Sequence, residues 1–164
     1  MSHKVFIGIG SNLNKNDNIL SCVNEIQKIF ENLCLSPVYE TQAMGFEGPN
    51  FYNFVCSFTT SKEIYDLKNC LNKIERNHGR NFNETKFSSR TLDIDILYFD
   101  NLILHNEKVQ IPRKEILEYD FVLKPLYDLD PDFMHPELEK SHKKLFEEGN
   151  FKKLILKEIN FNFK

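Results

Sequence analysis

The order of apolar and polar residues changes its period several times along the chain, which marks out strands and helices in turn. Four short runs rich in apolar, β-branched or aromatic residues predict strands, at residues 4–9, 35–41, 51–60 and 91–99. Two longer stretches repeat apolar residues every three or four positions and predict helices, at residues 17–33 and 62–78. The resulting order, β-α-β-β-α-β, predicts a ferredoxin-like α+β fold, in which both helices cover one face of an antiparallel sheet.

Individual residues predict where these elements begin, bend and end. Asp17 is expected to cap the first helix and Ser61 the second, because short polar side chains accept hydrogen bonds from the amides of a first helical turn. Gly79 fits the position just past the end of the second helix. Pro37 indicates an edge position or a bulge in the second strand.

The rest of the chain predicts smaller elements that belong to the same unit. We expect a hairpin at residues 102–104 and 108–111, helical turns across 113–128 with Pro125 ending a turn, a short helix at 141–148, and a tail at 150–164 that can pair as a strand. No repeat or linker interrupts the sequence, so residues 1–164 are expected to form a single domain with additional C-terminal strands and short helices.

Composition and charge exclude several classes of protein. The 164 residues are 41% hydrophobic and 27% charged, as in ordinary globular domains. The net charge of −3 argues against a nucleic-acid or membrane-surface binder. No apolar run approaches the ~20 residues of a membrane-spanning helix, and the first residues do not resemble a signal peptide. We therefore expect a cytoplasmic protein.

The four cysteines do not indicate a metal or redox site. Cys22, Cys34, Cys56 and Cys70 form no C-x-x-C pair, and none lies near a histidine at metal-ligand spacing. Free cysteine usually behaves as a small apolar residue, so buried thiols are expected at these positions.

The strongest chemical signal is the run from Thr91 to Asp95, which places two carboxylates on one predicted strand. Alternation puts Leu92, Ile94, Ile96 and Tyr98 on one face, and Asp93, Asp95, Leu97 and Phe99 on the other. Two carboxylates on one face repel each other unless a cation lies between them, and Mg²⁺ commonly binds one or two carboxylates together with substrate phosphates. The alternative is a solvent-exposed strand face on which the acidic pair, Asp93 and Asp95, has no ligand.

A basic, partly aromatic loop precedes this strand. Arg80, Lys86 and Arg90 are interleaved there with Phe82 and Phe87. Cations beside a carboxylate-bound metal are what a polyphosphate requires, because the metal neutralises only some of the phosphate oxygens. An ordinary solvated loop is the alternative interpretation.

Several other motifs follow one another in a specific order. They are Gly10-Ser11-Asn12-Leu13, Tyr39-Glu40-Thr41, Asn53, Ile74-Glu75 with Gly79-Arg80, the run Arg90-Thr91-Leu92-Asp93-Ile94-Asp95-Ile96, and Phe121-Val122-Leu123 with Pro125-Leu126. Together they resemble the 6-hydroxymethyl-7,8-dihydropterin pyrophosphokinase family of folate biosynthesis, over nearly the whole chain, from Val5 to about Pro136.

The resemblance implies a reaction and its reactants. The hydroxymethyl oxygen of the pterin would attack the β-phosphorus of ATP, so that pyrophosphate is transferred and AMP leaves. Two Mg²⁺ ions would be held by Asp93 and Asp95, with ATP as co-substrate. The implied partners are small molecules, with no nucleic acid or membrane, and the chain would act as a monomer. Association with other folate enzymes stays open.

The resemblance also implies a role for particular residues. The catalytic residues would be Arg80, Arg90, Asp93 and Asp95. ATP would be bound by Glu75, Arg80, Lys86, Arg90 and Ile96. The pterin would be bound by Thr41, Ala43, Met44, Phe51, Asn53 and Phe121, with Phe51 and Phe121 on the two sides of its flat ring.

The chain departs from the family pattern mainly in its basic residues. Lys86 replaces a frequent Arg, Phe87 a frequent Trp, Phe82 and Tyr119 an Arg of some members, and Arg113-Lys114 a region with a usual His. Lys lacks the two-pronged phosphate contact of Arg. An alternative is therefore a catalytically weak or inactive relative that binds pterin or nucleotide and serves as a scaffold for a neighbouring folate enzyme. The ferredoxin-like order also permits an RNA-binding module, which the net charge disfavours.

Overall fold

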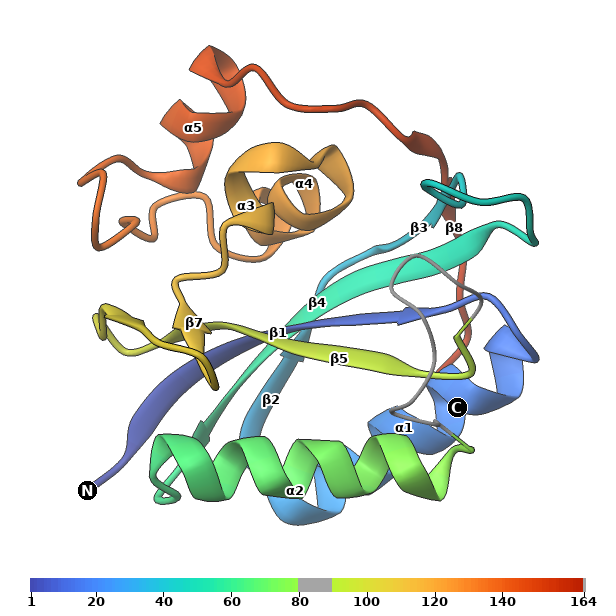
Figure 1. The fold of residues 1–164 in the computed structure, drawn as a ribbon, viewed down its shortest axis with the longest axis horizontal. Helices are drawn as coiled ribbons and strands as arrows, with labels where there is room; N and C mark the ends of the chain where they lie inside the picture. Colours follow the sequence, from blue (N-terminus) through green and yellow to red (C-terminus); the bar gives the residue numbers. More distant parts are fainter. Residues whose placement is uncertain (80–89, 164) are drawn as a thin grey trace.

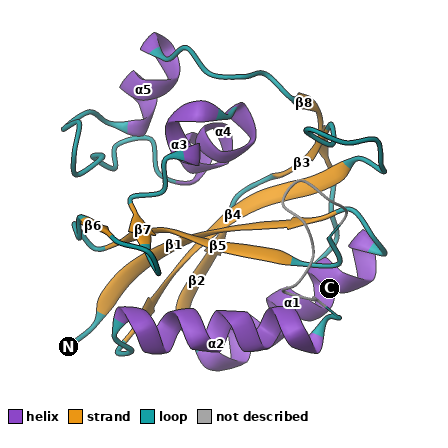
Figure 2. Ribbon diagram, in the orientation of Figure 1, coloured by secondary structure: helices purple, strands orange, loops and turns teal. Residues whose placement is uncertain are grey.

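The computed structural model describes residues 1–79 and 90–163 and shows an antiparallel sheet with helices on both faces (Figures 1 and 2). The main sheet has six strands in the order β5-β1-β4-β3-β8, with β2 also paired to β4. Its strands are β1 (His3–Ser11), β2 (Glu31–Leu35), β3 (Val38–Thr41), β4 (Phe51–Thr60), β5 (Asp93–Phe99) and β8 (Ile155–Ile159). The predicted α+β class, with an antiparallel sheet and flanking helices, is confirmed, and the chain order contains one additional strand, β2.

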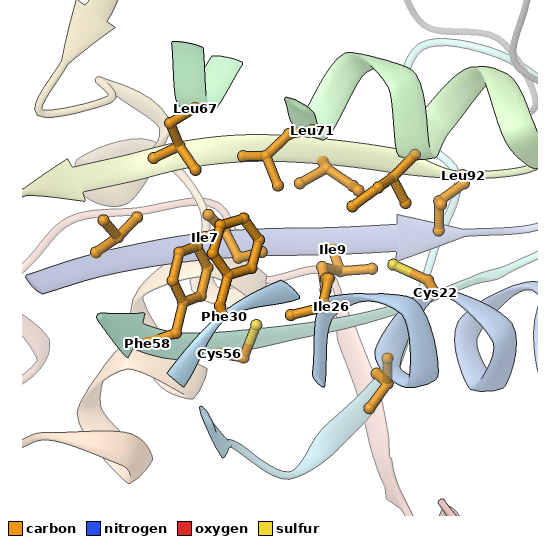
Figure 3. Close-up of a cluster of buried hydrophobic side chains, with 14 of the residues drawn as sticks. Ile7, Ile9, Cys22, Ile26, Phe30, Cys56, Phe58, Leu67, Leu71 and Leu92 are labelled. Carbon is orange, nitrogen blue, oxygen red and sulfur yellow. The ribbon is translucent and has the colours of Figure 1, made fainter. Parts of the chain in front are cut away.

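Helices α1 (Lys15–Ile29) and α2 (Ile64–Asn77) cover one face of the sheet (Figure 1). Their buried apolar stripes, which include Ile26 of α1, pack on side chains that β1 and β4 direct to the same side, such as Ile7 and Phe58 (Figure 3). Phe30 stacks on Phe58 with ring centroids 4.1 Å apart. This face forms the larger of the two hydrophobic cores that the described residues build.

The opposite face is covered over part of its length by α3 (Glu115–Glu118), α4 (Asp120–Leu129) and α5 (His142–Glu148) (Figure 1). A smaller core forms there around Phe6, Tyr98 and Leu126. A hairpin of β6 (Leu104–His105) and β7 (Gln110–Ile111) connects β5 to α3, as the sequence predicts. Within the described residues, no helix is long and apolar enough to cross a membrane.

Helix boundaries differ from the sequence prediction at three points. Asn14, in a left-handed conformation, precedes α1, and Asp17 lies inside the first turn instead of capping it. The helix ends at Ile29 rather than at residue 33, because Phe30 is extended and buries its ring in the core. Glu63 rather than Ser61 precedes α2, whereas Gly79 follows that helix with φ 82, as expected.

The predicted second strand, residues 35–41, is observed as β3, whereas residues 31–35, which the sequence assigned mostly to the first helix, form an additional strand, β2. Ser36 and Pro37 separate the two strands. Both pair with β4, β2 with its C-terminal part and β3 with its N-terminal part. Ser36 anchors the break, since its hydroxyl accepts a hydrogen bond from the amide of Val55 at 2.9 Å. Pro37 has no amide to donate, so the chain changes position along β4 at this point.

A β-bulge in β5 corrects the predicted alternation. Ile7 pairs with Ile96 but Phe6 pairs with Tyr98, so one extra residue is inserted on β5. Tyr98 therefore joins the smaller core and Phe99 the larger one, the reverse of the faces that strict alternation predicts.

The C-terminal elements are confirmed with one exception. Ser141 caps α5 by accepting a hydrogen bond from the amide of Lys144 at 3.1 Å, and β8 pairs with β3. Pro125 lies inside α4 and does not end a turn, because the helix continues to Leu129.

The expectation of buried thiols holds for only part of the cysteines. Cys22 and Cys56 are buried in the larger core, whereas Cys70 is half-buried and Cys34 is exposed. Cys34 is exposed because its side chain lies on the side of the short strand β2 that does not face α1 and α2.

Candidate active site

The candidate site lies on the sheet face opposite α1 and α2, where β1 has glycines in place of side chains. Gly8 pairs with Asp95 on β5, and Gly10 pairs with Asp93 on β5 and with Asn53 on β4. The two carboxylates and the Asn53 amide therefore flank the glycines in neighbouring strands. Strand register, and not proximity in sequence, brings these groups together.

Gly10 leaves room for the side chain of Asn53. A Cβ atom at position 10 would lie 2.4 Å from Asn53 Oδ1, so the Asn53 side chain would have to move to admit it. The amide nitrogen of Asn53 donates to Thr41 Oγ1 at 2.7 Å, which fixes the plane of the amide against β3. A Cβ at Gly8 would make only ordinary contacts, at 3.7 Å, with the side chain of Leu97.

A cavity of about 520 Å³ opens above these strands. Its lining includes aromatic rings from three places: Phe46, Phe51, Tyr119 and Phe121. The rings of Tyr119 and Phe121 stack at 5.2 Å, and Phe46 meets Phe51 edge-on at 6.4 Å. Polar and charged side chains line the same cavity: Thr41, Gln42, Asn53, Arg90, Asp93, Asp95 and Arg113. The cavity therefore suits a flat ligand with polar edges.

The acidic pair of Asp93 and Asp95 is half-buried and has a cation beside it. Arg113 Nη2 lies 3.8 Å from Asp95 Oδ1, and Arg113 Nε donates to Glu115 Oε2 at 2.9 Å. Burial alone would lower the pKa of Arg113, but the carboxylates of Asp95, Glu115 and Asp93 outweigh it and raise that pKa. The guanidinium thus stays charged next to the acidic pair.

A second, smaller cavity of about 160 Å³ lies beyond the acidic pair. Its lining includes Lys68, Asn72, Glu75, Ile96 and Lys108, and Asp93, Asp95 and Arg113 line both cavities. Glu75 is 3% exposed, and its Oε2 accepts a hydrogen bond from the amide of Ile94 at 2.9 Å. This bond ties α2 to the strand that carries the acidic pair.

The backbone of Arg90 is held by the loop after β1. Asn12 Oδ1 accepts from the Arg90 amide at 2.7 Å, and the Asn12 amide donates to the Arg90 carbonyl at 3.0 Å. Ser11 Oγ donates to the carbonyl of Thr91 at 2.6 Å. The Ser11-Asn12 motif therefore fixes the entry into β5, just before the acidic pair.

The structure brings together most of the residues that the sequence suggested. Those lining the larger cavity are Thr41, Met44, Phe51, Asn53, Arg90, Asp93, Asp95 and Phe121, and Glu75 and Ile96 line the smaller one. Ala43 is absent from the described lining of both cavities, although Gln42 and Met44 flank it. Arg80 and Lys86, with Phe82 and Phe87, fall outside the described residues.

Several lining residues were not predicted as part of the site. They are Gln42, Glu115 and Tyr119, and Arg113, whose reach the sequence left open. Tyr119 could have been found from the sequence, because it is aromatic and lies two positions before the predicted Phe121. No pattern in the sequence places Arg113 in the site, because its position depends on how the hairpin of β6 and β7 returns to the sheet.

Fold and site together define a class of protein. An antiparallel α+β sheet presents an acidic pair between an aromatic cavity and a smaller cavity with basic residues, which suits a transferase that holds two small substrates side by side.

Comparison with known proteins identifies the family. Residues 6–131 match the family model described as 7,8-dihydro-6-hydroxymethylpterin-pyrophosphokinase (HPPK). The chain belongs to this family. A relative from Aquifex aeolicus, named 2-amino-4-hydroxy-6-hydroxymethyldihydropteridine pyrophosphokinase, is 31% identical over 150 residues, which cover 90% of this chain and 93% of the relative.

Other relatives contain this unit within longer chains. The folic acid synthesis protein FOL1 of Dictyostelium discoideum is 35% identical over 136 residues, which cover 82% of this chain but only 20% of that protein. A solved structure of wild-type Plasmodium falciparum HPPK-DHPS matches 90% of this chain and 45% of its own, with a TM-score of 0.66 and 12% identity. The structural match supports the fold alone.

Proposed function

We propose that this chain transfers the pyrophosphoryl group of ATP to the hydroxymethyl group of 6-hydroxymethyl-7,8-dihydropterin in folate biosynthesis, with release of AMP. The observation that carries the proposal is the placement of the acidic pair in the lining of both cavities, in register with Gly10 and Asn53. Family membership, and the near full-length match to the Aquifex relative, support the same reaction.

The larger cavity is the proposed pterin site. Phe51 from β4 and Phe121 from α4 supply aromatic faces, and flat rings pack favourably on them in offset arrangements. Asn53, oriented by Thr41, offers an amide to the amide-like edge of the pterin. Met44 and the backbone near Ala43 are proposed to complete this end of the site.

The basic residues are proposed to bind the triphosphate. Arg90 lines the larger cavity, and Arg113 lines both cavities beside the acidic pair. A guanidinium can make two parallel hydrogen bonds to a phosphate, which fixes orientation as well as charge. Arg80 and Lys86, which lie outside the described residues, are also proposed to bind the triphosphate. Glu75 and Ile96 would lie near the nucleoside, since both line the smaller cavity.

Asp93 and Asp95 are proposed to hold Mg²⁺, with two ions expected. Their half-buried carboxylates supply the hard oxygen donors that Mg²⁺ prefers. Among residues 1–79 and 90–163 there is no group of three or more acidic, His or Cys side chains placed to hold a metal ion. Phosphate oxygens and water would therefore complete the coordination, as in other phosphoryl-transfer sites. Bound Mg²⁺ would neutralise the phosphate charge and polarise the reacting oxygens.

The chain itself contributes positioning and charge. The aromatic rings and Asn53 would hold the pterin so that its hydroxymethyl oxygen faces the acidic pair, and the arginines would align the triphosphate for attack at the β-phosphorus. Catalysis of phosphoryl transfer rests mainly on such alignment and on stabilising negative charge. We also propose that the chain works as a monomer, because one chain lines both cavities. Association with another folate enzyme is a further proposal, suggested by the fused relatives.

The test is AMP formation from ATP with each component omitted in turn. AMP that requires the dihydropterin and Mg²⁺ together would support the proposal. Saturable pterin binding in a parallel fluorescence titration, without any AMP, would contradict catalysis and identify a binding protein instead.

A further inference from the structure

We propose that residues 152–155, here called the C-terminal strap, fix the distance between two walls of the larger cavity, and that Asp120 is the positioning residue through which they act. The inference rests on the proposed function, since that cavity is the proposed pterin site. The strap lies beyond residues 6–131, the part of the chain that the family model matches. After α5 the chain returns to the sheet and enters β8 beside β3 (Figure 1).

The first wall is the turn from α3 into α4, which comprises Tyr119 and the first residues of α4, Asp120 and Phe121. Asp120 lies between these two rings in the sequence and is 7% exposed. Its Oδ1 accepts a hydrogen bond from the amide of Leu154 at 2.9 Å, and its Oδ2 accepts one from the amide of Ile155 at 3.1 Å. Both oxygens of a buried carboxylate are therefore used to hold the strap.

The backbone of the same turn is bonded to the strap as well. The amide of Lys152 donates to the carbonyl of Glu118 at 2.8 Å, and the amide of Asp120 donates to the carbonyl of Lys152 at 3.0 Å. Together with the two carboxylate contacts, these bonds connect the turn to both ends of the strap, at Lys152 and at Ile155. The backbone that carries the stacked rings of Tyr119 and Phe121 cannot shift without disturbing these bonds.

The second wall is the end of β3, which carries Thr41 and Gln42. The amide of Gln42 donates to the carbonyl of Leu154 at 3.1 Å, and Ile155 pairs with Thr41 across β3 and β8. Thr41 in turn accepts the bond from Asn53. Two consecutive strap residues, Leu154 and Ile155, thus contact both walls of the cavity.

This arrangement predicts that loss of the Asp120 carboxylate weakens the binding of one substrate, the pterin. Hydrogen bonds to an ionised carboxylate are stronger than neutral ones, and their loss leaves two strap amides without that acceptor. The walls that would loosen carry the proposed pterin contacts. None of the described residues lining the smaller cavity belongs to the strap or to either wall. The proposed nucleoside site should therefore be unaffected.

The test compares Asp120→Ala and Asp120→Asn with a matched control, Asp100→Ala. Asp100 also joins distant segments through its carboxylate, accepting from the amide of Lys4 at 2.7 Å and contacting His3 at 2.7 Å, but it lines neither cavity. Each full-length variant is measured for dihydropterin Kd by fluorescence titration without ATP, and for the KM of both substrates and kcat.

For Asp120→Ala we expect the pterin Kd and KM to rise roughly tenfold, while the ATP KM and kcat change by less than about twofold. Asp120→Asn keeps one acceptor oxygen and should recover part of the affinity. Asp100→Ala should leave the pterin Kd unchanged. Faster hydrogen exchange at the Gln42 amide in Asp120→Asn would show a loosened second wall, even where Asp120→Ala fails to fold.

Two results would overturn the inference: an unchanged pterin Kd in both Asp120 variants, or an equal loss of affinity in Asp100→Ala. Either result, with an active wild-type protein, rejects the strap alone. A wild-type protein that binds the dihydropterin but forms no AMP rejects the proposed catalysis instead, and the Kd comparison still tests the strap.

Discussion

The two faces of the sheet are formed by the same strands but are filled differently, and β1 shows the difference most clearly. Toward α1 and α2 it presents Val5, Ile7 and Ile9, all buried in the larger core. Toward the other side it presents Phe6, then Gly8 and Gly10. One face is filled with apolar side chains, whereas the other is filled at one end and left hollow at the end where the acidic pair lies.

The fold is stabilised on the filled face and kept open for ligands on the hollow face. The filled face excludes water and buries large apolar area, which is the main source of folding free energy. The hollow face loses that contribution at its glycines, and it retains half-buried carboxylates that burial disfavours. Substitutions on the hollow face should therefore affect function more than stability.

The largest expected effect is that of Asp95→Asn. This variant removes a proposed metal ligand while preserving shape, so kcat/KM should fall about a thousand-fold. The melting temperature should change little, because the residue lies on the hollow face. Activity within tenfold of the wild type, in a steady-state AMP assay, would remove Asp95 from the proposed metal site.

Substitution of the two glycines of β1 compares a position that contacts Asn53 with one that does not. In Gly10→Ala the new methyl group would displace the Asn53 amide, and the pterin Kd should rise by roughly 10- to 100-fold. Gly8→Ala is the matched control on the same strand, since its methyl group meets only the Leu97 side chain at ordinary distance. Equal pterin Kd values for the two variants would contradict the role given to Gly10.

A smaller effect is expected for Arg113→Ala. Loss of the guanidinium beside the acidic pair should raise the KM for ATP about tenfold, with the pterin Kd nearly unchanged. Arg113→Lys keeps the charge but not the two-pronged geometry, and it should fall between the wild type and the alanine variant. If the alanine variant bound ATP as tightly as the wild type, the contact between Arg113 and Asp95 would have no part in phosphate binding.

The smallest expected effect is the pH dependence of the free energy of unfolding that His142 contributes from the smaller core. His142 is fully buried in the smaller core, where its Nδ1 donates to the carbonyl of Asp130 at 2.8 Å and its Nε2 lies 3.1 Å from the Tyr98 hydroxyl. Burial lowers the pKa of His142 below its ordinary value of 6.5, and the nearby His135 acts in the same direction.

The sign of this effect follows from proton binding. Below pH 6.5 the unfolded chain binds a proton at position 142 that the folded chain does not, so the free energy of unfolding should fall as pH falls. His3 has a raised pKa and acts in the opposite sense, losing its contribution as pH rises. Urea unfolding of the wild type and of His142→Gln between pH 7.5 and 5.5 isolates the contribution of His142 to the free energy of unfolding. If the free energy of unfolding of the wild type fell with pH no more steeply than that of the variant, this role of His142 would be contradicted.

The sequence predicted local features better than those that depend on distant partners. The bounds of β4 at residues 51–60 and the shared face of Asp93 and Asp95 follow from alternation alone. The bulge that reverses Tyr98 and Phe99 depends on register with β1. The contact of Arg113 with Asp95 depends on the path of a hairpin, and the contact of Asp120 with Leu154 joins residues 34 positions apart. Periodicity within one segment carries no information about such contacts.

The most direct test of the account is the identity and ratio of the products. Purified chain, Mg-ATP and 6-hydroxymethyl-7,8-dihydropterin are incubated, and nucleotides and pterins are quantified by chromatography with mass detection. Attack at the β-phosphorus predicts one AMP for each pterin diphosphate formed. ADP with a pterin monophosphate, or ATP hydrolysis that does not require the pterin, would contradict the proposed pyrophosphoryl transfer.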